Sequence, residues 1–297
     1  MNRSVLAIII ALLIASAIPA LAADSPTYGL ITSLKLFPLN LDEKETEELL
    51  QMLDDESVLD RAAAASELGR RKATEAIQPL RLLLTDKSVV VQLDAATALL
   101  ELGEMDAMPV LRDLLAAVPL STRLHAAEAL ARFGDESGLD LARAQLTSEF
   151  SARRDAAIRA LAASKNDEVA YPALEAGLND PNSLVRRTAL YLLGKRPGKR
   201  SVELLGSVLS DPDRSIRLLT VAALANHGSR DAVPLLLDAL EDRDLVMCGI
   251  AASALNRVTG ENKRTIVLKP ERARQLEMEW REWWEANKDK PLPAEKN

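Results

Sequence analysis

Leucine recurs along the chain in two columns that share one nearly constant spacing. The steps in the first column are 31 residues, except for one step of 32. Its members are Leu68, Leu99, Leu130, Leu161, Leu193, Leu224 and Leu255. The second column repeats the same steps in the same order at Leu53, Leu84, Leu115, Leu146, Leu178, Leu209 and Leu240. Two columns with one period predict a stack of repeated units, each burying its apolar face against its neighbours.

Shorter signals between the leucines predict two helices in each unit. An aspartate precedes the first helix in five units, where its carboxylate can accept hydrogen bonds from free backbone amides. These residues are Asp55, Asp86, Asp180, Asp211 and Asp242. Gly103, Gly134 and Gly228 follow their leucines by four residues, at the point where a left-handed helix end favours glycine. Each unit is therefore predicted to be a hairpin of a helix of about 14 residues, a short turn and a helix of about 12.

Composition agrees with a helical interior. Hydrophobic residues make up 48% of the 297 residues but aromatic residues only 3%. The core must therefore consist mainly of leucine, alanine, valine and isoleucine. Alanine and leucine favour helices, and small side chains allow helices to approach closely. The sequence predicts an all-α protein.

The repeat motif resembles the HEAT repeat family, in particular the bacterial PBS-lyase HEAT-like type. The resemblance is carried by Asp180-Pro181, by Val185-Arg186 and by the Ala-rich run from Ala126 to Leu130. It implies a right-handed α-solenoid of about seven helical hairpins over residues 41–260. It also implies that an arginine of the first helix bonds turn aspartates or carbonyl groups between units. These structural arginines are Arg61, Arg123, Arg154, Arg186 and Arg217, and the column is broken by Gln92 and Cys248.

The N-terminus is typical of an export signal. Arg3 precedes an apolar run from Val5 to Ile18, and Ala20 and Ala22 provide a small-residue cleavage site. We therefore expect a signal peptide at 1–22, cleavage near Ala22/Ala23, and a periplasmic or secreted protein with an N-terminal cap or linker at 23–40. The alternative is an uncleaved membrane anchor, because the apolar run is about long enough to span a bilayer.

All three tryptophans lie near the C-terminus. A helix from Pro270 to Lys288 would place Leu276, Trp280, Trp283 and Trp284 on one face. We expect this segment, residues 261–288, to cap the open end of the stack, and residues 289–297 to form a flexible tail. An aromatic docking patch is the alternative interpretation.

Candidate chemistry is sparse. The two histidines, His125 and His227, are far apart in sequence, and Cys248 is the single cysteine. Such a set does not predict a zinc site. The HEAT-type hydroxylase that binds two irons uses His-Glu dipeptides, and neither histidine here precedes a glutamate. No catalytic residue, metal or cofactor is predicted. A lyase-type enzyme or a bilin-like small-molecule binder in the groove stays as the alternative.

Charge favours a protein partner over nucleic acid. The net charge is −7, and loss of residues 1–22 removes one arginine, which leaves 36 basic and 44 acidic residues. An acidic chain is a poor general binder of nucleic acid. Two basic groups could contact an acidic partner. The first is a row on the second helices, at Arg81, Arg112 and Arg143. The second is Arg187, Lys195, Arg196, Lys199 and Arg200.

The family resemblance implies that the second helices line the concave face, so the row could face a ligand. The alternatives are arginine stems packed over apolar neighbours and ordinary solvated surface. We expect a monomeric, exported, non-enzymatic scaffold that binds a protein or peptide on its concave face.

Overall fold

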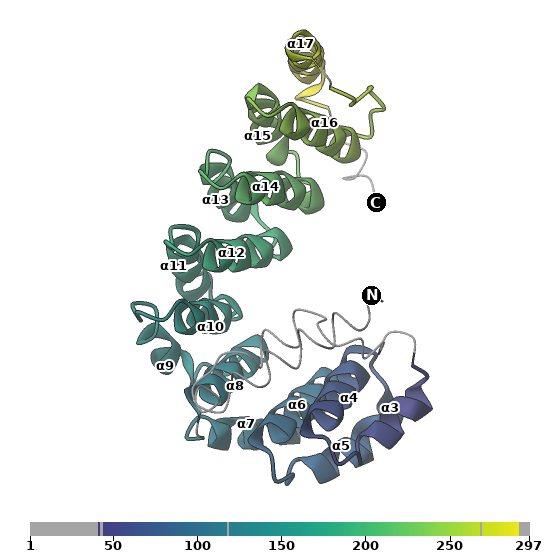
Figure 1. Cartoon of the computed structure of the whole chain (residues 1–297), viewed down its shortest axis with the longest axis vertical. Coiled ribbons are helices and arrows are strands. Elements are labelled where there is room, and N and C mark those ends of the chain that lie inside the picture. The colour runs from purple at the N-terminus through teal and green to yellow at the C-terminus, as the bar shows by residue number, and fades with distance from the viewer. Residues whose placement is uncertain (1–40, 42–43, 118, 268, 291–297) are drawn as a thin grey trace, which may run out of the picture. The chain divides into compact units, whose positions relative to one another are not determined.

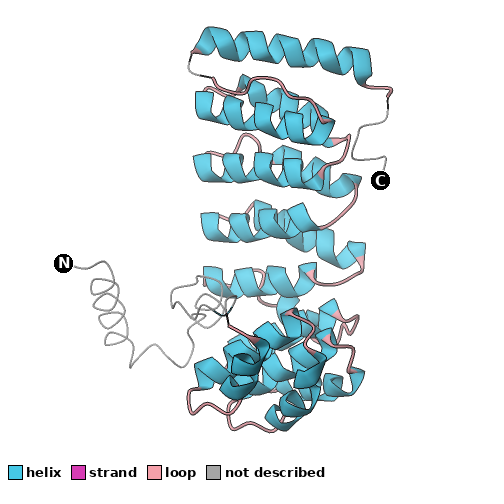
Figure 2. Cartoon of the chain, turned by 90° about the vertical axis from the view of Figure 1, so that its right-hand side faces the viewer, coloured by secondary structure: helices cyan, strands magenta, loops and turns pink. Residues whose placement is uncertain are grey.

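The computed structural model describes residues 41, 44–117, 119–267 and 269–290, and its regular elements there are all helical (Figures 1 and 2). The expected signal peptide, the 23–40 segment and all but two residues of the 289–297 tail lie outside this range. The chain divides into two compact units, unit 1 up to Asp167 and unit 2 from Glu168. None of the helices in the described ranges has the length and apolar character needed to cross a membrane.

Hairpins of two helices repeat through both units, which confirms the all-α solenoid. The first helices, which carry the first leucine column, have 12 to 15 residues each. They are α4 (Val58–Arg70), α6 (Val89–Glu101), α8 (Leu120–Arg132), α10 (Ser151–Ala162), α12 (Ser183–Lys195), α14 (Arg214–His227) and α16 (Leu245–Thr259).

The second helices are shorter than predicted, because 3-10 turns take up part of several of these segments. They are α3 (Thr46–Met52), α5 (Ile77–Leu83), α7 (Met108–Leu114), α9 (Leu139–Arg143), α11 (Asp167–Leu178), α13 (Lys199–Ser207) and α15 (Ala232–Asp238). The short turns are η2 (Thr74–Ala76), η3 (Met105–Ala107) and η4 (Ala239–Glu241). Only α11 has the expected length of 12 residues.

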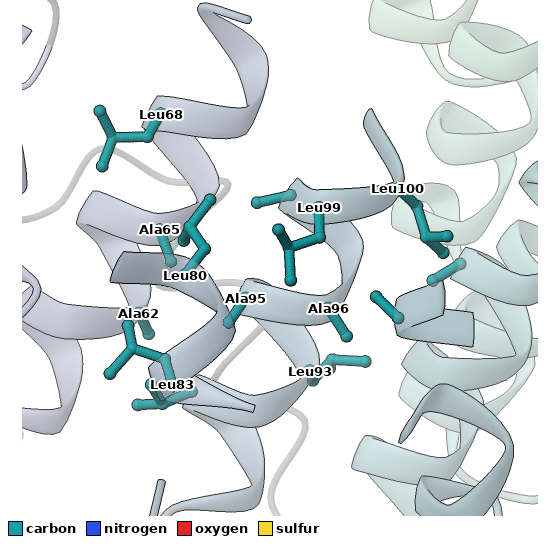
Figure 3. Close-up of a cluster of buried hydrophobic side chains, with 14 of the residues drawn as sticks. Ala62, Ala65, Leu68, Leu80, Leu83, Leu93, Ala95, Ala96, Leu99 and Leu100 are labelled. Atoms are coloured by element: carbon teal, nitrogen blue, oxygen red, sulfur yellow. The ribbon is translucent and has the colours of Figure 1, made fainter. Parts of the chain in front are cut away.

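The first leucine column lies in the core, and Figure 3 shows Leu68 and Leu99 among the other buried side chains of the first hairpins. Every first-column leucine is at most 2% exposed. In the second column Leu53, Leu178 and Leu240 are buried, whereas the other four are partly buried. Each fully buried leucine contributes roughly 2 kcal/mol relative to an exposed one. The repeat spacing therefore reflects one apolar position per hairpin.

First helices approach one another closely at small residues. A Cβ added at Gly69 of α4 would lie 2.7 Å from the Cα of Ala98 in α6. A Cβ at Gly194 of α12 would lie 3.2 Å from the Cβ of Ala223 in α14. Successive first helices pack more closely than successive second helices do.

This spacing determines which layer lines the inner side of unit 1. A stack bends toward its more closely spaced layer, so α4, α6, α8 and α10 line the inner side of unit 1 (Figure 1). The expectation that the second helices line the concave face is therefore wrong for this unit. Arg81, Arg112 and Arg143 belong to the outer layer, on α5, α7 and α9.

The turn aspartates differ in detail from the expected helix caps. Each accepts a hydrogen bond of 2.8 Å from the backbone N–H two residues further on. The helix cap is instead the residue that donates this N–H, as at Asn182, Asp213 and Asp244. The aspartates thus order the turn, and the residue two positions later caps the helix that follows.

The single longer repeat coincides with the boundary between the units. The 32-residue step occurs between Leu146 and Leu178 and between Leu161 and Leu193. Both intervals share residues 161–178, and the boundary follows Asp167. The structure thus places the division between the units inside the one segment where the period changes.

The C-terminal helix α17 (Pro270–Asn287) covers the end of unit 2. It packs against α15, α16 and η4. Leu276 and Trp280 are completely buried. Trp283 meets Trp280 edge to face, with ring centroids 5.6 Å apart, and Trp284 lies under the Arg230 guanidinium at 5.1 Å. Trp283 and Trp284 stay half-buried.

Candidate functional site

Three arginines of the first helices connect their own hairpin to the next one. Arg61 donates from Nε and Nη2 to Asp86 at 2.9 and 3.0 Å, and from Nη1 to the carbonyls of Asp55 and Glu56. Arg186 makes the same set of contacts, with Asp211 as the acidic partner. Arg217 donates from Nε to Asp242 and from Nη1 to the carbonyls of Asp211 and Pro212. The hydrogen bond from Arg61 lowers the pKa of Asp86, which keeps the pair charged.

The other members of the column also bond carbonyl groups of the turn before their helix. Arg123 donates to the Leu115 carbonyl and Arg154 to those of Ser148 and Glu149. Gln92 donates to the Asp86 carbonyl, while the Cys248 thiol donates to those of Leu240 and Asp242. Every member therefore bonds the preceding turn, and Arg61, Arg186 and Arg217 add an ion pair to the following one.

Each arginine of the row on the second helices forms an ion pair with a nearby acidic side chain. Arg81 forms ion pairs with Glu104 and Asp106. Arg112 pairs with Asp135 at 2.6 Å, and Arg143 with Asp140 at 2.6 Å. Because these carboxylates offset the arginine charges, the row offers little net charge to an anionic ligand.

The inner face of unit 1 carries a charge network that the sequence interpretation missed. Glu101 pairs with Arg132, Arg132 with Glu128, and Glu128 with Arg159. These residues lie two positions before or after a first-column leucine, so their common register was the available signal. The network connects α6, α8 and α10 across their exposed sides.

Two titratable groups on first helices of unit 1 have shifted pKa values. Burial raises the pKa of Asp94 on α6 to about 7, against the opposing hydrogen bond from Ser66 on α4. Burial lowers the pKa of His125 on α8, while nearby Glu128 opposes that shift. Both groups therefore favour their neutral forms. No group of three or more His, Cys, Asp or Glu side chains with metal-binding geometry occurs among the described residues.

The predicted basic residues of unit 2 gather around two tyrosines. Arg196 and Arg200 lie over the buried ring of Tyr171, at 5.2 and 4.6 Å from its centroid. The Tyr171 hydroxyl shares a hydrogen bond of 3.1 Å with Ser201. Lys195 lies 4.1 Å from the centroid of Tyr191, which is 61% exposed. Tyrosine rings therefore hold three cations in place by cation–π contacts.

The other two basic candidates have weaker local contacts. Lys199 lies 3.9 Å from Glu203 on the exposed surface of α13. Arg187 lies on the exposed side of α12 and helps to lower the pKa of Asp213, after that residue's hydrogen bonds with Ser215. The structure thus brings Lys195, Arg196 and Arg200 to the junction of α12 and α13, and it places Arg187 two helical turns away.

Known proteins resemble this chain in sequence pattern and in fold. The family described as HEAT repeats matches residues 46–122, 119–194, 171–256 and 202–270. The structure of the complex of CpcE and CpcF of phycocyanin lyase from Nostoc sp. PCC7120 is 22% identical. The matched region covers 80% of this chain and 95% of the chain in that structure, with a TM-score of 0.43.

Two further solved structures are similar at the same level. Human deoxyhypusine hydroxylase in complex with glycerol is 21% identical over 73% of this chain and 85% of its own, with a TM-score of 0.37. YibA of Escherichia coli is 18% identical over 86% and 97%, with a TM-score of 0.43. Curated proteins gave no match. Since the HEAT motif covers most of residues 46–270 in overlapping segments, the chain belongs to the HEAT repeat family.

Proposed function

We propose that this HEAT-repeat chain is an exported, non-enzymatic scaffold that binds a protein partner through the face of its first helices. The supporting observation is the close packing of successive first helices within each unit. Arginine ties to the turns hold these helices in register, as at Arg61 and Asp86. Side chains on the exposed side of the first helices are therefore held at fixed spacings before a partner arrives. Such a surface loses little conformational entropy on binding.

The export part of the proposal rests on the N-terminal sequence. The positive start, the apolar run and the Ala-Leu-Ala ending at Ala22 are the features of a cleaved signal. Cell fractionation and N-terminal sequencing of the mature protein test it. The expected result is a periplasmic or secreted chain that begins at Ala23, and a cytoplasmic chain that retains Met1 would contradict it.

Site-specific photocrosslinking in the native cell envelope tests the binding face. A photoreactive residue at Thr97 or Leu219, on first helices of the two units, should crosslink a protein at a defined molecular mass. The control position is Leu82, on a second helix, where the side chain is 76% exposed. Crosslinks at Leu82 alone, or at none of the three positions, would contradict the proposal. A co-purified chromophore seen by absorbance would support the lyase-type alternative instead.

A further inference from the structure

Six large apolar side chains are exposed among the described residues of unit 2, and four of them lie on its first helices, whereas Ile266 and Met278 lie elsewhere. The four on the first helices are Leu184 and Tyr191 on α12, Leu219 on α14 and Val246 on α16, with exposed fractions of 57, 61, 39 and 55%. Isolated exposed leucines are common on protein surfaces, but exposed apolar side chains that share one face indicate an interaction surface.

The repeat register shows that these four side chains share one face. Leu184 and Val246 stand nine residues before their first-column leucines, Leu219 stands five before and Tyr191 two before. Positions nine, five and two before the same leucine are four or three residues apart, so they follow one side of a helix. Because α12 packs against α14 and α14 against α16, the side chains form one row across three helices.

The floor between these side chains is built from small residues. Ala222 on α14 and Ser253 on α16 occupy the same register position as Tyr191, and both are exposed. Small side chains leave room for a second chain to approach the helices closely. We call the set of Leu184, Tyr191, Leu219, Val246, Ala222 and Ser253 the apolar row.

The charged residues on the first helices of unit 2 are all basic or histidine. Helices α12, α14 and α16 contain no Asp or Glu, whereas each first helix of unit 1 contains at least one. Two residues after the first-column leucine, unit 2 carries Lys195 on α12 and Arg257 on α16. Lys195 contacts the ring and hydroxyl of Tyr191, and Arg257 donates to the Asn226 side chain. Both of these partners are uncharged.

The same register position in unit 1 is different. Arg132, also two residues after its leucine, forms ion pairs with Glu101 and Glu128. The carboxylates that cap α14 and α16, Asp213 and Asp244, are already engaged. Asp213 accepts from the Ser215 N–H, and Asp244 accepts from the Val246 N–H and from Arg214. Lys195 and Arg257, at the end of the row away from these caps, therefore contact uncharged groups.

From this arrangement we infer that the apolar row of unit 2 and its basic edge bind an acidic segment of a partner protein. Apolar side chains of that segment would cover Leu184, Leu219 and Val246, while its carboxylates would meet Lys195 and Arg257. Charge complementarity selects an acidic occupant, because the face offers cations and its own helices offer no carboxylate. The inference rests on the proposed scaffold function and adds the unit, the residues and the chemistry of the partner.

Two synthetic peptides test the partner chemistry with the full mature chain. Both are helical, of about 15 residues, which covers three helices packed about 10 Å apart. They share one leucine pattern and differ only in glutamate or lysine at the polar positions. Binding measured by fluorescence anisotropy should give a Kd for the glutamate peptide that is lower than the Kd for the lysine peptide by about tenfold or more. Equal affinity for the two peptides would overturn the inference.

Paired variants locate the site. The double variant Lys195→Glu and Arg257→Glu should weaken the glutamate peptide about tenfold and strengthen the lysine peptide. Leu184→Ser with Leu219→Ser should weaken both peptides. Matched controls are Arg243→Glu, an exposed turn arginine, and Leu59→Ser, which has the register of Leu184 and is 40% exposed. Circular dichroism verifies that every variant is folded. If the controls weaken binding as much as the tested pairs do, the apolar row is not the site.

The cellular crosslinks separate this inference from the proposed function. A partner crosslinked at Leu219 through a segment rich in Asp and Glu supports both. A partner crosslinked at Thr97 and absent at Leu219 keeps the scaffold function and overturns the assignment to unit 2. A partner segment at Leu219 without an excess of acidic residues overturns the assigned chemistry while the scaffold function stands.

Discussion

Arg186 binds both carboxylate oxygens of Asp211, 25 residues later in the chain, with Nε–Oδ2 and Nη2–Oδ1 distances of 2.9 and 3.1 Å. The same Asp211 accepts the backbone N–H of Asp213, the cap of the next first helix. One ion pair thus connects the start of α12 to the start of α14. Arg61 with Asp86 and Arg217 with Asp242 repeat this connection.

Loss of this ion pair should destabilise unit 2. The Arg186 and Asp211 side chains are 13% and 7% exposed, so Arg186→Ala leaves a poorly solvated carboxylate without its partner. We expect a loss of about 3 kcal/mol, seen as a lower denaturation midpoint in urea. The control is Arg123→Ala, which removes a contact with the Leu115 carbonyl and should cost about 1 kcal/mol. Equal losses in the two variants would mean that the ion pair adds nothing beyond the carbonyl contacts.

Filling the close contact between α4 and α6 should also destabilise the protein. A Cβ at Gly69 would lie 2.7 Å from Ala98, so Gly69→Ala forces these helices apart at a cost of about 1–3 kcal/mol. Alanine in a helix is otherwise better than glycine by about 1 kcal/mol, which works in the opposite direction. We expect a lower melting temperature in thermal unfolding.

Gly194→Ala provides the comparison for the preceding variant, because its Cβ would lie 3.2 Å from that of Ala223. This contact needs a smaller adjustment, so the change in melting temperature should be smaller or positive. A Gly69→Ala protein that melts higher than the parent would show that the helices can separate without loss.

Asp94 should make the protein less stable as the pH rises. Its folded pKa of about 7 exceeds the unfolded value of about 3.9, so the folded state holds a proton that the unfolded state has released. Stability therefore falls between about pH 4 and pH 7 and is constant above. Asp94→Asn should remove this fall and stabilise the protein at pH 8 by up to about 4 kcal/mol, measured by urea unfolding.

His125 acts in the opposite direction and must be separated from Asp94. Burial lowers its pKa, so the unfolded state gains a proton first as the pH falls below about 6.5, and folding becomes less favourable. The comparison of the parent protein with the Asp94→Asn variant is therefore repeated in a His125→Gln background. If the free energies of unfolding of the proteins with Asp94 and with Asp94→Asn differ by the same amount at pH 5 and at pH 8, Asp94 does not titrate as described.

Trp280 should hold the end of unit 2 together. Its side chain is completely buried, so Trp280→Ala leaves a cavity and should cost about 4 kcal/mol. Trp280→Phe keeps most of the apolar volume and removes a buried Nε1 that has no acceptor among the described residues, so its cost should be smaller. Trp284 is half-buried, so Trp284→Ala should also cost less. Calorimetric melting curves of the three variants test the order, and an unchanged melting point for Trp280→Ala would refute the cap.

Local periodicity was enough to predict the fold class. Helix geometry places apolar side chains at fixed intervals, so one leucine column recurs at the same point of each first helix. Leu68 and Leu255, at opposite ends of the column, are both completely buried. The helix from Pro270 and the left-handed glycines at 103, 134 and 228 were also predictable, because local sequence governs helix ends.

The identity of the inner helix layer and the partners of the charged side chains could be found only from the tertiary structure. Which helix layer lines the inner side of unit 1 depends on how closely the helices of each layer approach one another. The close contact between Gly69 and Ala98 belongs to this packing, and it exists only in the folded stack. The partner of Arg81 could not be predicted, since Glu104 and Asp106 belong to the next hairpin. The pKa of Asp94 depends likewise on burial between helices that are separated in sequence. Local helix geometry makes the repeating residues visible in the amino-acid pattern alone. Contacts between hairpins set which of these residues stay exposed and which charges lack an ionic partner, so these properties emerge only when the hairpins pack together.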